Sequence, residues 1–132
     1  MRGTVKFFDK SKGWGFITNS ENNKDIFIHN TNIQMLGYRF LDEGDLVDYE
    51  IGVGNNDKEQ ARNVTPIISL NNVENALNAD SEKVLRVYTQ KDEYGVLKYY
   101  VVDINSNLQT SEQGMNLLEL AAYAGIDVEG LV

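Results

Sequence analysis

Two stretches decide the fold of this chain: Lys12-Gly13-Trp14-Gly15-Phe16-Ile17 and, nine residues after its end, Ile26-Phe27-Ile28-His29. Each is typical of a short β-strand with an aromatic ring at every second position. Residues i and i+2 of an extended strand point to the same face, so Trp14 and Phe16 share a face. For the same reason, Phe27 and His29 share a face in the second stretch. The sequence therefore predicts two neighbouring strands that gather their rings on one side.

Small and basic residues surround these rings. Gly13 and Gly15 place no side chain beside them, which we expect to leave the rings accessible and to let another molecule approach the backbone. Lys12 and Lys24 add positive charge at the margins. Rings and cations on an open strand face suit single-stranded nucleic acid, because every base has a π-face and every nucleotide has a phosphate.

The rings have an alternative role as core residues, and for an isolated aromatic pair on a strand that role would be favoured. Here the alternate strand positions already supply a core for the opposite face. These positions hold Val5, Ile17, Ile26 and Ile28. The rings are then surplus to the core, and large exposed aromatic residues usually mark a binding surface.

Turn residues and alternating patterns predict five strands in the first half of the chain, as expected for a small closed barrel. The single proline, Pro66, is expected to end this domain, because proline cannot extend a central ladder. The predicted strands are Thr4–Asp9, Trp14–Asn19, Asp25–His29, Leu46–Gly52 and Gln60–Thr65.

Five sequence blocks run in the order and spacing of a bacterial cold-shock domain, and the chain resembles that family over residues 1–67. The blocks are Gly3-Thr4-Val5-Lys6-Phe7-Phe8-Asp9, Lys12 to Ile17, Asp25 to His29, Leu41-Asp42-Glu43-Gly44 and Asn63-Val64-Thr65. The resemblance implies an all-β, five-stranded OB-fold barrel. It also implies binding of single-stranded RNA or DNA with low sequence specificity, as an RNA chaperone. The second half resembles no family that we recognise.

The resemblance assigns nucleic-acid binding to nine positions. His29 would serve as a stacking ring, and the loop aromatic Tyr38 would close over the strands. For the lysines, phosphate contact is favoured over a role as solvated strand charges. The nine residues are Lys6, Phe7, Phe8, Lys12, Trp14, Phe16, Phe27, His29 and Tyr38. For Asp9 and Asp25, a turn role and a base contact remain equal alternatives.

Two departures from the family pattern bear on affinity. Asn30 stands where the family usually has a phenylalanine, which removes one stacking platform worth about 1–3 kcal/mol per base, unless its amide bonds a base edge. The usual basic-Gly-Pro loop element is replaced by Asn55-Asn56-Asp57-Lys58-Glu59. We therefore assign no contact to Lys58.

Composition limits the remaining roles. The net charge is −8, but residues 1–66 hold 8 basic and 10 acidic residues, whereas residues 67–132 hold 4 and 10. One face of the first half can therefore be basic in an acidic chain. The chain has no cysteine and one histidine, so we expect no metal or other cofactor. No catalytic motif, apolar signal segment or membrane-length stretch is present, which favours a non-enzymatic, cytoplasmic protein.

The second half is expected to contain an asparagine-rich linker and a small α+β (ββα) module. Residues 68–80 read as the linker, with a short helix from Asn72 as an option, and residues 81–132 as the module. A hairpin is predicted from Lys83–Gln90 and Val96–Ile104 around Gly95. A helix is predicted over Thr110–Ala124, capped by Thr110 or Ser111 and ended by Gly125. Its apolar stripe would be Met115, Leu118, Ala121, Ala122 and Ile126.

This acidic module is expected to repel phosphates and not to bind nucleic acid. One helix cannot cover both faces of a hairpin, and Tyr99-Tyr100-Val101-Val102 is apolar on both. One face should then remain for a partner. A homodimer is the first choice and docking on a different protein is the second. The alternative function is a protein-interaction, regulatory or inhibitor protein that acts through the acidic module and binds nucleic acid weakly.

Overall fold

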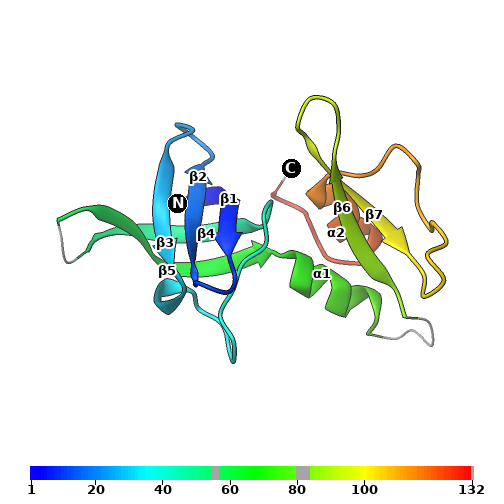
Figure 1. Ribbon diagram of the computed structural model, residues 1–132, viewed down its shortest axis with the longest axis horizontal. Coiled ribbons are helices and arrows are strands. Elements are labelled where there is room, and N and C mark those ends of the chain that lie inside the picture. Colours follow the sequence, from blue (N-terminus) through cyan, green and yellow to red (C-terminus); the bar gives the residue numbers. More distant parts are fainter. Residues whose placement is uncertain (55–56, 80–83, 132) are drawn as a thin grey trace. The chain divides into compact units, whose positions relative to one another are not determined.

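The computed structural model describes residues 1–54, 57–79 and 84–131. The chain divides into two compact units, Met1–Ser69 and Leu70–Val132, which are drawn in Figure 1.

The first unit is the predicted five-stranded closed barrel. Its strands are β1 (Arg2–Asp9), β2 (Trp14–Asn19), β3 (Asp25–His29), β4 (Leu46–Val53) and β5 (Glu59–Ile68), and a 3-10 turn η1 (Asn30–Asn32) follows β3. The strand order around the barrel is β1-β2-β3-β5-β4. The pairings are antiparallel except for β3 with β5, which is parallel and is made at Phe27 and Gln60. The bounds of β2 and β3 are those predicted from the sequence.

The barrel core follows the strand parity. Val5, Ile17 and Ile28 are at most 1% exposed, and Ile26 is 9% exposed. The long β3–β4 connection adds Ile33 and Leu41 to the same core. The inward positions therefore carry aliphatic side chains, and the rings of β2 and β3 are left for the other face.

Pro66 does not end the barrel domain, contrary to the prediction. Strand β5 continues to Ile68, which is buried and pairs with Leu46. Pro66 lies opposite Val47, where the register between β4 and β5 shifts. Proline is tolerated at an irregular position of this kind, because the regular ladder hydrogen bond that its missing N–H would have donated is interrupted there.

The second unit contains α1 (Leu70–Leu77), β6 (Arg86–Lys91), β7 (Leu97–Val102) and α2 (Leu117–Tyr123). Helix α1 occupies most of the segment expected to be a linker. Its Val73 is fully buried, its Glu74 carboxylate accepts the Val87 N–H at 3.1 Å, and the following Asn78 side chain bonds both backbone groups of Leu85. The segment is thus packed onto β6. The predicted hairpin is present, with Gly95 at φ 78° in its turn.

Helix α2 begins seven residues later than predicted. Met115 exchanges two backbone hydrogen bonds with Tyr99, so residues before α2 run along β7. Gly114, at φ 79°, closes the turn just before Met115, and Asn116, just after it, caps α2 in a reciprocal capping box with Glu119. The residues before Asn116 therefore pair with the edge of β7 instead of extending α2. The predicted stripe is partly confirmed, because Ala121 is buried, and partly wrong, because Leu120, which lay outside it, is buried and Ala122 is exposed.

Candidate nucleic-acid interface

Four rings on β1, β2 and β3 form one contiguous cluster, which we call the ring cluster: Phe7, Trp14, Phe16 and Phe27. Trp14 is at its centre, with ring centroids 5.5 Å from Phe7, 6.0 Å from Phe16 and 6.3 Å from Phe27. Phe16 and Phe27 are 6.0 Å apart and lie edge to face. None of these side chains is fully buried. The cluster is therefore a ring surface on the outside of the barrel.

Strand register brings the rings together. Phe16 pairs with Phe7 on one side and with Phe27 on the other. Simple alternation would place Phe7 inward together with Val5, but the register shift between these two residues turns Phe7 outward, to 44% exposure. The same shift packs Phe8 against the core. Phe8 is thus the predicted site residue of β1 that the fold directs away from the ring cluster.

The two glycines of the β2 stretch have a different role from the predicted one. A Cβ on Gly15 would lie 2.1 Å from the Phe7 carbonyl oxygen, and one on Gly13 would lie 2.5 Å from the Asn30 amide nitrogen. Both glycines are buried. The space beside the rings is therefore occupied by the protein's own chain: Gly15 permits close packing of β1 on β2, and Gly13, in the β1–β2 turn, leaves room for the Asn30 side chain.

His29 extends the ring surface at the end of β3, where it pairs with Trp14. Its Nδ1 atom accepts the Thr31 backbone N–H at 3.3 Å and lies 3.0 Å from the Thr31 hydroxyl. The imidazole therefore caps η1, which holds the half-buried ring in a defined orientation.

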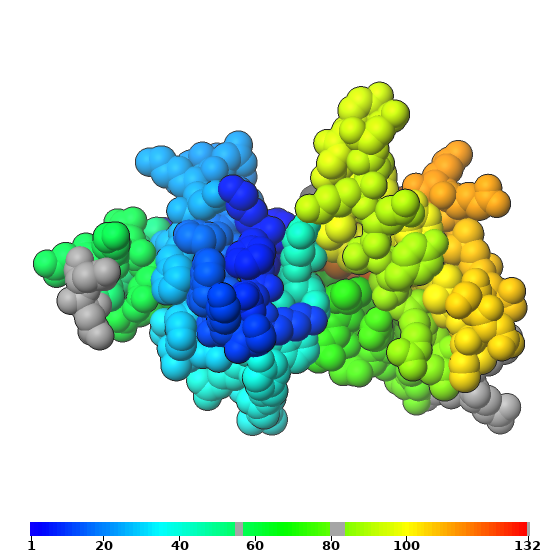
Figure 2. Space-filling view, viewed as in Figure 1, coloured from blue at the N-terminus to red at the C-terminus, as the bar shows by residue number. Residues whose placement is uncertain are grey.

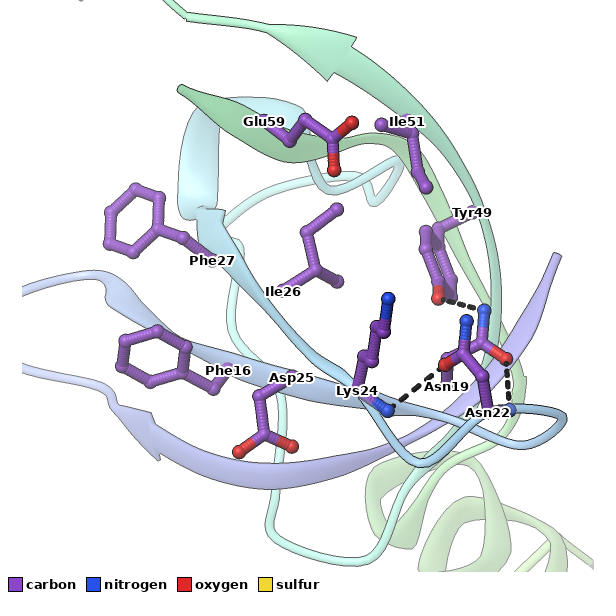
Figure 3. A pocket seen from close by; sticks show the side chains of 10 residues that line it. All are labelled: Phe16, Asn19, Asn22, Lys24, Asp25, Ile26, Phe27, Tyr49, Ile51 and Glu59. Carbon is purple, nitrogen blue, oxygen red and sulfur yellow. Dashed lines mark hydrogen bonds between the residues drawn. The ribbon is translucent and has the colours of Figure 1, made fainter.

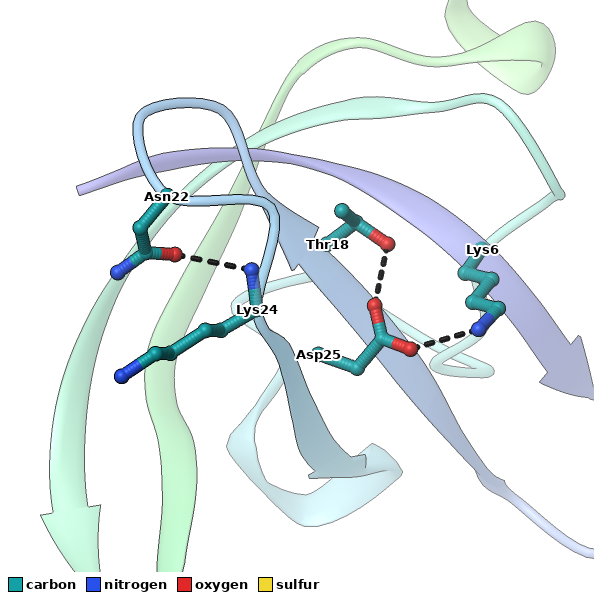
Figure 4. A network of polar contacts seen from close by, with 5 residues as sticks. All are labelled: Lys6, Thr18, Asn22, Lys24 and Asp25. Carbon is teal, nitrogen blue, oxygen red and sulfur yellow. Dashed lines mark hydrogen bonds and ion pairs between the residues drawn. The ribbon is translucent and has the colours of Figure 1, made fainter.

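Lys6 and Asp25 form an ion pair at the margin of the ring cluster, shown in Figure 4. The ammonium nitrogen lies 2.6 Å from one carboxylate oxygen, and the Thr18 hydroxyl donates to the other at 2.7 Å. The Lys6 ammonium and the Thr18 hydroxyl lower the pKa of Asp25 below its ordinary value. Lys6 is thus positioned beside the rings, with its ammonium engaged by Asp25.

Asp9 shapes the turn between β1 and β2. One carboxylate oxygen accepts the Ser11 hydroxyl at 2.7 Å and the backbone N–H groups of Ser11 and Lys12 at 3.0 Å. These hydrogen bonds, led by the Ser11 hydroxyl, lower the pKa of Asp9. The carboxylate thus has a turn role, which is one of the two alternatives given for it. The exposed Lys12 side chain has no ion pair among the described residues.

Tyr38 lies outside the ring cluster and is 62% exposed. Its ring stacks on Phe40 with centroids 5.9 Å apart, and its hydroxyl donates to the Lys10 carbonyl oxygen. The Lys10 ammonium lies 4.9 Å from the Phe40 centroid and 2.5 Å from Asp42. Tyr38 and Phe40 therefore tie the β3–β4 loop to the β1–β2 turn. Phe40 and Lys10 were not among the predicted site residues, although the i, i+2 spacing of Tyr38 and Phe40 was a signal for the former.

Among the residues that the structure describes, no group of three or more metal-ligating side chains comes together. None of the described helices has the length and apolar character needed to cross a membrane.

Comparison with known proteins gives a family match and several relatives over the first half of the chain. Residues 1–67 match the family model described as "'Cold-shock' DNA-binding domain". The chain is 49% identical to a cold shock-like protein of Aquifex aeolicus over 51 residues, which are 39% of this chain and 73% of that protein. It is 50% identical to a cold shock-like protein of Thermotoga maritima over 54 residues, 41% of this chain and 80% of the relative. Cold shock-like protein CspE of Escherichia coli is 46% identical over 54 residues, with shares of 41% and 78%.

Proposed function

Because the chain belongs to the "cold-shock" DNA-binding domain family, whose model matches residues 1–67, we propose that its barrel binds single-stranded RNA or DNA with low sequence specificity. In this proposal bases stack on the ring cluster and on His29, and Lys6 and Lys12 contact phosphates. By holding bases unstacked, the protein acts on nucleic acid as a chaperone and not as an enzyme. We place it in the cytoplasm, in line with the absence of cysteine.

The observation that carries the proposal is the ring cluster itself. Four rings lie within 6.3 Å of a neighbour on the outside of a barrel whose core is already filled by aliphatic residues. Such rings are not needed for burial, and a base of any identity can stack on them. Stacking should dominate over charge, because Lys6 is engaged by Asp25 and the chain is acidic.

Titration with an oligothymidine tests this function. Trp14 is the single tryptophan, so base stacking on the ring cluster should quench the intrinsic fluorescence. Replacing Phe16 or Phe27 by Ala should weaken binding by about 1–3 kcal/mol. The matched control is Tyr94→Ala, an aromatic residue of the second unit that is 82% exposed. No quench at micromolar protein and low salt would refute the proposal.

For the second unit we propose self-association through one face of the hairpin. Tyr99 and Val101 of β7 point into the core of the unit and are buried, so the alternate residues form what we call the hairpin outer face: Arg86, Tyr88, Tyr100 and Val102. Tyr88 and Tyr100 stack with centroids 4.8 Å apart at 12°. Figure 2 shows β6 in yellow-green at the surface of this unit.

Charge supports this choice of face. The 4 basic residues of the second half all fall within residues 83–98, in and beside the hairpin, together with only 2 of its 10 acidic residues, Asp92 and Glu93. Two copies that meet at the hairpin outer face keep their acidic surfaces apart. Docking of a different protein on the same face is the second candidate. It would make the chain an interaction or regulatory protein with weak nucleic-acid binding.

A further inference from the structure

A pocket of about 410 Å³ opens beside the ring cluster, between the β2–β3 turn and strands β4 and β5 (Figure 3). Its volume is within the range of small-molecule sites. The lining residues are Phe16, Asn19, Asn22, Lys24, Asp25, Ile26, Phe27, Tyr49, Ile51 and Glu59. Phe16 and Phe27 belong to both the pocket and the ring cluster, so the two surfaces are continuous.

The chemistry of the pocket changes from its floor to its rim. Ile26 and Tyr49 are core residues, and Ile51 on β4 is 42% exposed. The polar groups of the floor are satisfied within the protein: the Asn19 amide donates to the Tyr49 hydroxyl at 2.8 Å, and its oxygen accepts the Glu21 N–H at 2.8 Å. The floor therefore offers mainly apolar and ring surface, which suits a flat, weakly polar group.

The rim supplies groups for a charged and hydrogen-bonding ligand. Figure 3 shows the Lys24 side chain extending across the pocket toward Ile26 and Tyr49, with the Glu59 carboxylate on the far side. The Lys24 ammonium makes no ion pair among the described residues. A cation above an apolar floor is the arrangement that a nucleotide needs, with its base in the pocket and its phosphate on the lysine.

We infer that this pocket takes one base of the strand that stacks on the ring cluster, and that Lys24 contacts the phosphate of that nucleotide. The inference rests on the proposed function and extends it, since it adds a site outside the exposed ring surface. A strand that reaches only the rings leaves the pocket empty. A longer strand fills it, so the contribution of the pocket depends on strand length.

Two pairs of variants of the full chain test the inference. Ile51→Ala removes the pocket wall, and its control Val53→Ala removes a similar side chain of β4 that is 57% exposed and does not line the pocket. Lys24→Gln removes the rim cation, and its control Lys58→Gln makes the same charge change outside the pocket lining. Each protein is titrated with oligothymidines of increasing length, with Trp14 quenching as the readout.

We expect Ile51→Ala and Lys24→Gln each to weaken binding of the longer strands about fivefold or more, while the shortest quenching strands and both controls are unchanged. The inference is overturned if each variant matches its control, or if short and long strands lose affinity equally while Trp14 is still quenched. Wild-type protein that shows no quench at any length would instead remove the proposed function, and the inference with it. Lys24→Gln keeps the test valid if Ile51→Ala proves unstable.

Discussion

At the scale of single residues, the ion pair of Lys6 with Asp25 limits how much charge the ring cluster can offer to a phosphate. The pair is short, at 2.6 Å, but the lysine side chain is 62% exposed, so the pair adds little to stability. We expect its main effect to be on binding, because a phosphate that approaches the rings would have to displace a carboxylate from Lys6.

Replacing Asp25 by Asn is expected to strengthen binding of an oligothymidine several-fold, because it frees Lys6 and removes a negative charge beside the strand. The salt dependence should become steeper by about 0.7 in the logarithmic slope, the value for one additional phosphate contact on a single strand. Trp14 quenching at several salt concentrations measures both. Asp48→Asn, an equal charge change on β4, should leave the slope unaltered. Equal behaviour of the two variants would argue against competition for Lys6.

The pH dependence of Asp25 has a defined sign. Lys6 and Thr18 lower its pKa in the folded state below the ordinary value of 3.8. The stability that the pair contributes is therefore fully present above 3.8 and is lost as the pH falls through the lower, folded-state pKa. Chemical denaturation of wild type and Asp25→Asn should differ by a constant amount near neutral pH and converge in acid. A difference that grows on acidification would contradict this assignment.

At the scale of the structural elements, the register between β1 and β2 decides which rings face outward. The shift between Val5 and Phe7 exposes Phe7 and packs Phe8 inward. Gly15 allows the two strands to approach, because a side chain there would meet the β1 backbone. The ring cluster thus depends on backbone geometry as much as on the rings.

We expect Gly15→Ala to destabilise the barrel by about 1–3 kcal/mol or more, since its Cβ would lie 2.1 Å from the Phe7 carbonyl oxygen. Gly54→Ala is the control, because its nearest neighbour would be the flexible Gln60 side chain at 3.4 Å. Denaturant unfolding compares the two. If Gly15→Ala instead kept full stability and lost only oligonucleotide binding, the glycine would serve ligand access, as the sequence had indicated.

A second prediction at this scale concerns the residue that caps the start of α2. Asn116→Ala removes the capping box and should lower the free energy of unfolding of the second unit by about 1 kcal/mol. Ser111→Ala should have a much smaller effect, because its hydroxyl accepts the Gln113 N–H, at 3.2 Å, in the turn before α2 and does not cap the helix. Thermal unfolding followed by circular dichroism separates the two. A larger loss of stability in Ser111→Ala than in Asn116→Ala would place the start of the helix at Ser111.

At the scale of the whole molecule, the chain combines a barrel of the cold-shock domain family with a second unit, Leu70–Val132, that is more acidic. No family model matches the second half, so its role rests on its own surface. The hairpin outer face presents stacked tyrosines in the one part of that unit where its basic residues gather. In the proposed dimer, a contact there would link two barrels and double the number of ring clusters available to one strand, which would raise avidity without new base contacts.

Light scattering should therefore find the full chain as a dimer and residues 1–69 as a monomer. Tyr88→Glu should convert the dimer to a monomer, because it introduces a charge into the stacked pair. Tyr94→Glu, the same change at the exposed hairpin tip, should not. A monomeric full-length chain would exclude self-association and leave docking on another protein as the role of this face.

The sequence by itself determined the elements whose signal is local. The alternation of aliphatic and aromatic residues in Trp14–Asn19 and Asp25–His29 predicted both strands with their observed bounds, and the family blocks predicted the barrel. Gly95 likewise marked its turn, since a left-handed backbone favours glycine. These features depend on residues close in the chain, so their patterns can be read without knowing what packs against them.

Tertiary structure decided the features that depend on distant partners. Phe7 faces outward and Phe8 inward only because β1 shifts register against β2, and Pro66 stays within β5 because of an irregularity opposite Val47. Residues before Asn116 pair with β7 rather than extend α2, since an exposed strand edge offers their backbone groups hydrogen bonds. The pocket beside the ring cluster is likewise formed by residues from β2 to β5, which lie together only after the barrel closes.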